Sequence, residues 1–324
     1  MARNPQRGQT GLRRLRDQAY IKTRKTLRTL LFPLYQRLGV RSLVAFFVPG
    51  YRQVTKSPGG RHLICELGGT AGDTFTIATI GDYGSGKPAS FDVRDLVDAE
   101  NAQAVVTLGD NIYYETGFAT LVGALYDKWL TGGTFFPATG NHDYREGRGI
   151  ALFDRFFGFL GGHRWYSVSI GPVDFFMLDS HQALHHPDVF DAQRQWLERA
   201  TQQSQATWKV VVTHHPPHSA RSRSQHEFRF PYDQWGVSMV MSGHDHTMQH
   251  LVVDDVNYVV NGVGGGSLHY FEEVLEGTEF RLADHYGAVM LDVSPGSLNV
   301  RFVTVDTGVV HEFAVPAPTS RLSA

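Results

Sequence analysis

Short runs of apolar and β-branched residues recur from residue 75 onward, and most of them end in a small residue followed by Asp, Asn or His. The runs have the length of strands and do not alternate between apolar and polar positions, which is typical of strands buried on both faces. The expected strands cover 75–80, 104–108, 135–139, 173–178, 208–213, 237–242, 258–263, 288–293 and 300–305.

Helical spacing of apolar residues falls between these runs. Three helices are expected from the apolar positions Val93, Leu96 and Val97 after a capping Ser90, from Val122, Leu125, Tyr126 and Trp129, and from Val189, Trp196, Leu197 and Ala200 after Asp188. Strands that alternate with helices predict an α/β layered fold. In such folds ligands bind beyond the carboxyl ends of the strands, where the polar residues of this chain lie.

The N-terminal part of the chain has a different pattern. Leucines recur at helical spacing between residues 11 and 48, with Arg and Lys in the gaps and an interruption at Pro33. Residues 1–61 hold 14 basic residues and one acid, Asp17, a net charge of +13, whereas the remainder carries −15. We therefore divide the chain into a basic amphipathic extension, 1–73, and a catalytic domain, 74–324.

The extension has the composition of an interfacial helix on anionic lipid. Nucleic acid is a less favoured partner, because no aromatic residues that could stack on nucleobases are interleaved with the Arg and Lys residues. A solvated tail and a transit peptide remain alternative interpretations of the extension. The longest uncharged stretch, 42–51, is shorter than the roughly 20 apolar residues of a membrane span. A secretory signal sequence needs a continuous apolar stretch soon after its first basic residues, and in this chain further basic residues interrupt that stretch. We expect a cytoplasmic protein with peripheral membrane contact as an option, and the oligomeric state stays open.

Composition limits the class of site. With 324 residues and 42% hydrophobic positions, the chain can bury the core of one large domain, and disorder throughout is excluded. The single cysteine, Cys65, excludes an intrachain disulfide and a cysteine-based zinc site. Histidine, of which there are 16, must supply any nitrogen ligands.

The polar residues after the strands form a candidate metal site. Taken singly, each has a commoner role in a turn, a cap or a hydrogen bond to the backbone. Taken together, five strand ends present ligands that hard and borderline metal ions prefer. Two carboxylates, an amide, three imidazoles and a phenol are too many for one ion but suit two.

Five blocks of sequence carry a resemblance to a known family. They resemble the ordered blocks of the calcineurin-like metallophosphoesterases, and in detail the purple acid phosphatase (tartrate-resistant acid phosphatase-like) branch, from about residue 74 to 305. The resemblance implies a four-layer α/β/β/α sandwich of two mixed sheets, with a dinuclear metal site at the carboxyl ends of the strands. The blocks are Gly81-Asp82-Tyr83-Gly84, Gly109-Asp110-Asn111-Ile112-Tyr113, Gly140-Asn141-His142-Asp143, Val211-Val212-Thr213-His214 and Gly243-His244-Asp245-His246.

Two positions decide the branch. Most of the superfamily has a histidine two residues after the first aspartate, where this chain has Gly84. The branch has a tyrosine three residues after the second aspartate, and Tyr113 stands there. A phenolate is a hard, basic ligand that suits a trivalent ion. The resemblance therefore implies Fe(III) at the Tyr113 position and Fe(II), Zn or Mn at the other.

The resemblance also implies which residues hold each metal. His215 matches no ligand position and is expected to support the ligands, while Asp245 is expected to point away from them. One metal would be held by Asp82, Asp110, Tyr113 and His246, and the other by a bridging Asp110 with Asn141, His214 and His244.

The activity implied is that of a metal-dependent phosphoric ester hydrolase, in which a metal-activated hydroxide attacks phosphorus in line. His142 would protonate the leaving group, and a second histidine, His226 in preference to His218, would assist it. The loop that holds these histidines also holds three arginines, which would either form a basic rim around the substrate or be exposed to solvent. They are Arg221, Arg223 and Arg229.

Three functions stay open at this point. The first is a phosphomonoesterase, and the second is a phosphodiesterase with the same ligands. The third is a non-catalytic protein that binds lipid or nucleic acid through its basic extension. Metal analysis of the purified protein separates the third from the other two.

Overall fold

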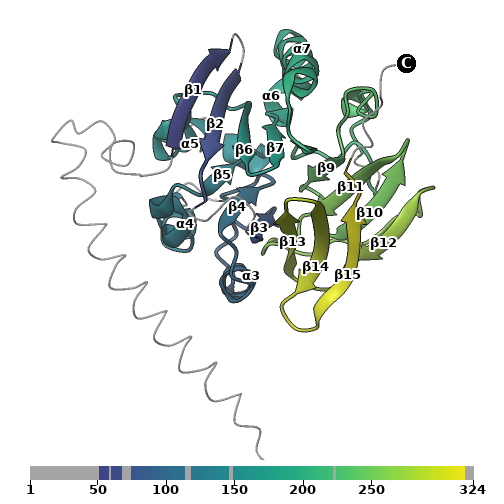
Figure 1. Cartoon of the computed structure of the whole chain (residues 1–324). Helices are drawn as coiled ribbons and strands as arrows, with labels where there is room; N and C mark the ends of the chain where they lie inside the picture. Colours follow the sequence, from purple (N-terminus) through teal and green to yellow (C-terminus); the bar gives the residue numbers. More distant parts are fainter. Residues whose placement is uncertain are drawn as a thin grey trace, which may run out of the picture. The chain divides into compact units, whose positions relative to one another are not determined.

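The computed structural model describes residues 51–57, 60–67, 74–113, 118–145, 149–221 and 224–317. The amphipathic helix expected between residues 11 and 48, and Arg223, lie outside these ranges. Within them the chain forms two β-sheets, one of nine strands and one of six. Figure 1 shows their arrangement with the helices around them.

The larger sheet mixes parallel and antiparallel neighbours. Strands β7, β8, β9 and β11 are parallel to one another, and β2 is parallel to β6. In order across the sheet, the strands are β1 (Tyr51–Ser57), β2 (Gly60–Cys65), β6 (Tyr166–Ile170), β7 (Val173–Met177), β8 (Trp208–Val212), β9 (Met239–Ser242), β11 (Val256–Asn261), β10 (Met248–Val253) and β12 (Thr278–Leu282).

The smaller sheet is also mixed. Strands β3, β4 and β5 are parallel, and β13 joins them to an antiparallel pair at the other edge. Its order is β15 (Gly308–Val315), β14 (Ser297–Thr304), β13 (Gly287–Ser294), β3 (Phe75–Ile80), β4 (Ala104–Thr107) and β5 (Phe135–Pro137).

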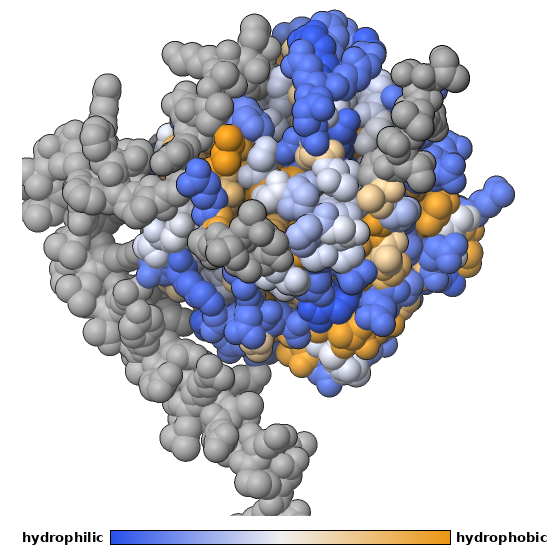
Figure 2. Space-filling view, in the orientation of Figure 1, coloured by the Kyte–Doolittle hydropathy of each residue, from blue (hydrophilic) through white to orange (hydrophobic). Residues whose placement is uncertain are grey.

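Successive side chains of the central strands point to opposite faces of the larger sheet, and their contacts show which layer covers each face. In β7, Phe175 and Met177 belong to the core that joins the two sheets, while Phe176 packs on the opposite face with Trp196 and Leu197 of α7 (Pro187–Gln203). Strand β8 repeats this division. The outward side of α7, at the top of the view, is mainly hydrophilic (Figure 2). Helix α7 and the short α6 (Ser180–His185) therefore cover the larger sheet.

Helices on the other side complete the sandwich. Helix α3 (Pro88–Ala99) contacts β13 and α4 (Asp127–Gly132) contacts β5, both in the smaller sheet, and Figure 1 shows α3 on the side opposite α7. The four-layer α/β/β/α fold of two mixed sheets is confirmed. The remaining short elements are η1 (Phe118–Val122), η2 (Asn141–Tyr144), α5 (Gly149–Phe156), η3 (Gly158–Leu160) and η4 (His226–Phe228).

Two expected helices differ in detail. Ser90 does not cap α3: the helix begins at Pro88, whose fixed φ suits the first helical position, and Ser90 is buried inside it. The face expected from Val122 to Trp129 is split, because the N–H of Gly123 binds the carbonyl of Phe118 five residues earlier and closes a π-helical turn. An α-helix starts again only at Asp127.

The sheet also begins earlier than the expected catalytic domain. Strands β1 and β2 lie within the range assigned to the extension, and Leu63 of β2 pairs with Val168 of β6. The division of the chain at residue 73 stays a prediction. None of the helices in the described ranges combines the length and apolar character needed to cross a bilayer.

Candidate metal centre

The seven predicted ligands come from the carboxyl ends of parallel strands in both sheets. In the smaller sheet, β3 leads to Asp82, β4 to Asp110 and β5 to Asn141. In the larger sheet, β8 leads to His214 and β9 to His244. Tyr113 and His246 follow in the same loops. The packing of the two sheets thus brings together residues that are up to 164 positions apart in sequence.

The loops approach one another so closely that side chains are excluded at two glycines. A Cβ atom at Gly84 would lie 2.3 Å from the carbonyl oxygen of Asn111, and one at Gly140 would lie 2.3 Å from Oδ1 of Asp110. Asp82 and Asp110 themselves have φ angles of +58° and +52°. Positive φ is uncommon for a residue with a side chain, and residues in this conformation recur at functional sites.

One group of atoms converges around Asp82. The hydroxyl of Tyr113 lies 3.3 Å from Oδ1 of Asp82 and 3.0 Å from Nε2 of His246, which is itself 3.1 Å from the same carboxylate oxygen. The other oxygen of Asp82 accepts the backbone N–H of His244 at 2.8 Å. A carboxylate, an imidazole and a phenol thus meet at one point.

A second group converges around Asn141. Its Oδ1 lies 3.1 Å from Nε2 of His214 and 3.0 Å from Nδ1 of His244. Oδ1 of Asp110 is 3.4 Å from the same nitrogen of His214. One ligand atom each from Asp82, Asp110 and His214 lies within 4.8 Å of the others. Asp110 therefore lies between the two groups.

The outer nitrogens of two imidazoles face carbonyl oxygens. Nδ1 of His214 is 2.8 Å from the carbonyl oxygen of Leu108, and Nδ1 of His246 is 2.5 Å from that of Ser267. A ring nitrogen beside a carbonyl must carry the proton, which leaves a lone pair on Nε2 of the neutral ring. This is the arrangement in which metal-binding histidines are held. The lone pair of His246 then faces a carboxylate oxygen of Asp82, and two acceptors so placed need a proton or a metal cation between them.

The pKa values indicate the same need for positive charge. Burial and repulsion from Asp82 raise the pKa of Asp110 well above its usual range. Burial and the same carboxylate raise the pKa of Tyr113. Burial is the largest single influence and lowers the pKa of His246, but the carboxylate of Asp82, the carbonyl of Ser267 and Asp245 together raise it overall. The seven residues therefore fit a metal centre, in which cations take the place of protons.

Asp143 holds two of the loops together. Its Oδ2 accepts hydrogen bonds of 2.8 Å from the N–H of Gly140 and from the side-chain amide of Asn111, and its Oδ1 accepts the N–H of Ile112 at 3.2 Å. Oδ1 of Asn111 in turn accepts the hydroxyl of Tyr83 at 2.8 Å. Asp143 is fully buried, so it fixes the loops after β4 and β5 relative to each other.

His142, the predicted proton donor, lies beside the centre. Its backbone N–H donates to Oδ1 of Asp110 at 2.7 Å, and its Nε2 is 3.8 Å from the other oxygen of that carboxylate. Its ring is 4.2 Å from the ring of Tyr113. Burial, with a contribution from Arg145, lowers the pKa of His142 to about 4, so the free imidazole is neutral at pH 7.

The loop after β8 holds the other predicted residues. His226 is exposed on η4, and His218 is half-buried with its ring 4.5 Å from that of Tyr258. Burial, followed by the charges of Arg229 and His226, lowers the pKa of His218 to about 4. Which histidine assists catalysis stays a prediction.

Two arginines of this loop make internal contacts. Arg221 lies 3.8 Å from Asp245 and 3.5 Å from Glu272. The hydroxyl of Ser219 also donates to Asp245, so the carboxylate of Asp245 contacts this loop. Nε of Arg229 donates to the carbonyl of Pro217 at 2.9 Å.

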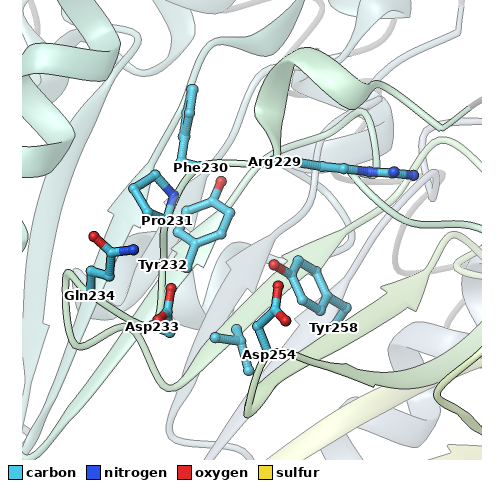
Figure 3. A pocket seen from close by; sticks show the side chains of 9 residues that line it. Arg229, Phe230, Pro231, Tyr232, Asp233, Gln234, Asp254 and Tyr258 are labelled. Carbon is cyan, nitrogen blue, oxygen red and sulfur yellow. The ribbon is translucent and has the colours of Figure 1, made fainter.

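A hollow of about 300 Å³ lies next to this loop (Figure 3). The guanidinium of Arg229 points away from Asp233 and Gln234 in this view. None of the seven predicted ligands lines the hollow, which is formed by Arg229, Phe230, Pro231, Tyr232, Asp233, Gln234, Asp254, Val256 and Tyr258.

One residue beside the centre, His269, was not expected from the sequence. Its ring stacks on that of His246, with centroids 4.1 Å apart and planes 3° from parallel, and its Nδ1 accepts the backbone N–H of His246 at 3.1 Å. It follows a run of glycines, Gly264 to Gly266, more than 20 residues after the last sequence block. No spacing or motif pointed to it.

Comparison with known proteins identifies relatives of this chain. Residues 75–248 match the model of the calcineurin-like phosphoesterase family, which is more than half of the chain. Purple acid phosphatase 3 of Arabidopsis thaliana is 25% identical over 289 residues, covering 74% of this chain and 77% of that protein. Purple acid phosphatase 17 of the same plant is 23% identical over 239 residues, 59% and 68% of the two chains.

Solved structures share the fold at lower identity. GAP50, described as the anchor in the inner membrane complex of Plasmodium, superposes with a TM-score of 0.63 at 16% identity, covering 76% of this chain and 90% of that one. A purple acid phosphatase from yellow lupin (Lupinus luteus) seeds gives a TM-score of 0.59 at 17% identity, covering 78% of this chain and 58% of that one.

Proposed function

The chain belongs to the calcineurin-like phosphoesterase family, and on that basis we propose that it is a dinuclear phosphomonoesterase of the purple acid phosphatase type. One observation carries the finer assignment: the phenol of Tyr113 meets Asp82 and His246, while the backbone around Gly84 leaves no room for a side chain. A centre built in this way takes its fourth ligand from tyrosine instead of from a histidine at position 84.

The proposed centre has two positions that share Asp110. Asp82, Tyr113 and His246 complete the first, and Asn141, His214 and His244 complete the second. When bound, two cations at such a centre acidify water and withdraw charge from phosphoryl oxygens. The raised pKa of Tyr113 favours a strongly polarising ion, so we assign Fe(III) to the first position and Fe(II), Zn or Mn to the second.

His142 is the proposed proton donor to the leaving group. In the free centre its lowered pKa keeps it neutral at pH 7. A phosphomonoester brings two negative charges beside it, which favour the imidazolium, and the leaving oxygen can then take the proton. The neighbouring ring of Tyr113 and the backbone bond to Asp110 restrict where the imidazole can move.

The basic extension is a separate part of the proposal. The charge of +13 over residues 1–61 and the leucines of this segment suit an anionic membrane surface, and one relative of similar fold is described as a membrane-complex anchor. Sedimentation with anionic vesicles should show salt-sensitive binding that neutral vesicles lack. Equal sedimentation with both kinds of vesicle would contradict the membrane role.

Hydrolysis of 4-nitrophenyl phosphate and bis(4-nitrophenyl) phosphate, measured with the metal content of the same sample, tests the substrate class. We expect kcat/KM to be higher for the monoester. A higher value for the diester would show a phosphodiesterase with the same ligands. Protein that holds two metal ions and hydrolyses neither ester would contradict the catalytic role.

A further inference from the structure

His215 is a buried imidazole for which the sequence blocks provide no ligand role. It directly follows His214 and is 6% exposed. Its ring centroid lies 4.5 Å from that of His244 and 5.0 Å from that of His214. One ring nitrogen from each of these three histidines lies within 4.8 Å of the other two.

The side chain of His215 is held as a metal-binding histidine is held. Its Nδ1 lies 2.8 Å from Oγ of Ser180, which also accepts the backbone N–H of His215 at 3.3 Å. This hydroxyl can accept the Nδ1 proton, which leaves a lone pair on Nε2. The carbonyl of Leu108 fixes His214 in the same way, so neighbouring residues share one mode of anchoring.

The ring planes allow adjacent residues to converge. The imidazoles of His214 and His215 stand 84° apart, and that of His215 is tilted by 48° from that of His244. The rings are therefore not stacked in parallel, and their nitrogens lie close enough together to face one cation.

We propose that His215 is a further ligand of the second metal position, donating Nε2 to the cation that Asn141, His214 and His244 hold. This inference rests on the proposed function, because it adds a ligand to the same centre. Three imidazole nitrogens, beside the amide oxygen of Asn141 and the shared carboxylate of Asp110, make that position rich in nitrogen, while the first has carboxylates, a phenol and one imidazole. Imidazole nitrogen suits Zn²⁺ and Fe²⁺ better than Mn²⁺, so of the three open choices Mn is the least suited to this position.

Calorimetric titration of the metal-free protein with Zn²⁺, and separately with Mn²⁺, tests this assignment without using turnover. The wild type should bind two equivalents of Zn²⁺. Loss of a supporting group outside the ligand set lowers metal affinity by about 10- to 100-fold. In His215→Ala, the affinity for one equivalent of Zn²⁺ should fall by more than this range, while the affinity for the other equivalent stays unchanged. The preference of the weakened position for Zn²⁺ over Mn²⁺ should also be smaller than in the wild type.

Two further variants make the result specific. The side chain of His215→Gln has a volume similar to that of histidine, and this variant should also lose Zn²⁺ binding at the second position. The test therefore remains valid if the alanine variant does not fold. His181→Ala is the matched control, because its ring also stacks with that of His215, 6.2 Å away, but lies outside the three-histidine group. It should bind both equivalents normally.

The outcomes separate the two proposals. If the wild type binds two equivalents and a folded His215 variant binds both with unchanged affinity, His215 is not a ligand and the dinuclear centre stands. An equal loss in His181→Ala would also overturn the ligand assignment. If the wild type binds one equivalent, the variants are compared at that equivalent; if it binds no Zn²⁺, the dinuclear centre itself is wrong, and this inference falls with it.

Discussion

The phenol oxygen of Tyr113 lies 3.0 Å from Nε2 of His246, and both atoms are within hydrogen-bonding distance of one carboxylate oxygen of Asp82. The pKa of this phenol is raised by burial and by the carboxylates of Asp82 and Asp110. The protein alone therefore opposes ionisation of Tyr113, and only a cation at the meeting point makes the phenolate favourable. This links the geometry of the site to the kind of metal it holds.

His142→Ala should keep both metal ions and lose turnover, because the side chain lies beside the centre without belonging to the predicted ligands. General acid catalysis typically contributes 10² to 10⁴-fold, so kcat for an alkyl phosphate should fall by about that factor. The loss should be smaller for 4-nitrophenyl phosphate, whose leaving group needs no proton. An equal loss for both substrates would indicate a positioning role.

Gly84→Ala should destabilise the fold, because the new Cβ would lie 2.3 Å from the carbonyl oxygen of Asn111. Overpacking of this kind typically costs about 1–3 kcal/mol of unfolding free energy, measured by urea denaturation. Gly296→Ala is the matched control, since nothing lies within 4 Å of its Cβ, and its stability should change by less than about 0.5 kcal/mol. Equal stability of the two variants would refute the close approach at Gly84.

Asp143→Ala should loosen the two metal loops, because it removes the acceptor of the N–H groups of Gly140, Asn111 and Ile112. Each buried donor left without a partner costs about 1–3 kcal/mol. Zinc affinity should fall by about 10- to 100-fold, as for other groups that orient metal ligands.

Asp254→Ala provides the comparison for Asp143, because Asp254 is an exposed aspartate in the turn between β10 and β11. It should leave zinc affinity unchanged. Wild-type zinc affinity in a folded Asp143→Ala protein would show that the loops hold their positions without the carboxylate.

Sequence patterns located the strands that carry the site more precisely than the other elements. The run from Phe75 to Ile80 gave the bounds of β3, because an uninterrupted apolar run leads directly into Gly81 and Asp82. The glycine and aspartate that follow this run also predicted where the loop after β3 begins. Residues selected by both burial and ligand chemistry were therefore predictable.

Features that depend on contacts between distant segments were not predictable. β2 gains its place from pairing with β6, more than 100 residues later, and no local pattern encodes that partner. His269 contacts His246 because a glycine-rich segment returns to the centre. The clash that would exclude a side chain at Gly84 arises from the backbone of another loop. Each of these features requires the assembled fold.

The visible absorption spectrum of the iron-loaded protein tests the central claim most directly. A phenolate bound to Fe(III) absorbs visible light by charge transfer, so the oxidised wild type should be coloured and Tyr113→Phe should be colourless with its iron retained. Tyr83→Phe is a suitable control, because Tyr83 follows Asp82 directly but its hydroxyl binds Asn111. That variant should keep the band. A colourless iron-loaded wild type, or a band that survives in Tyr113→Phe, would contradict the purple acid phosphatase assignment.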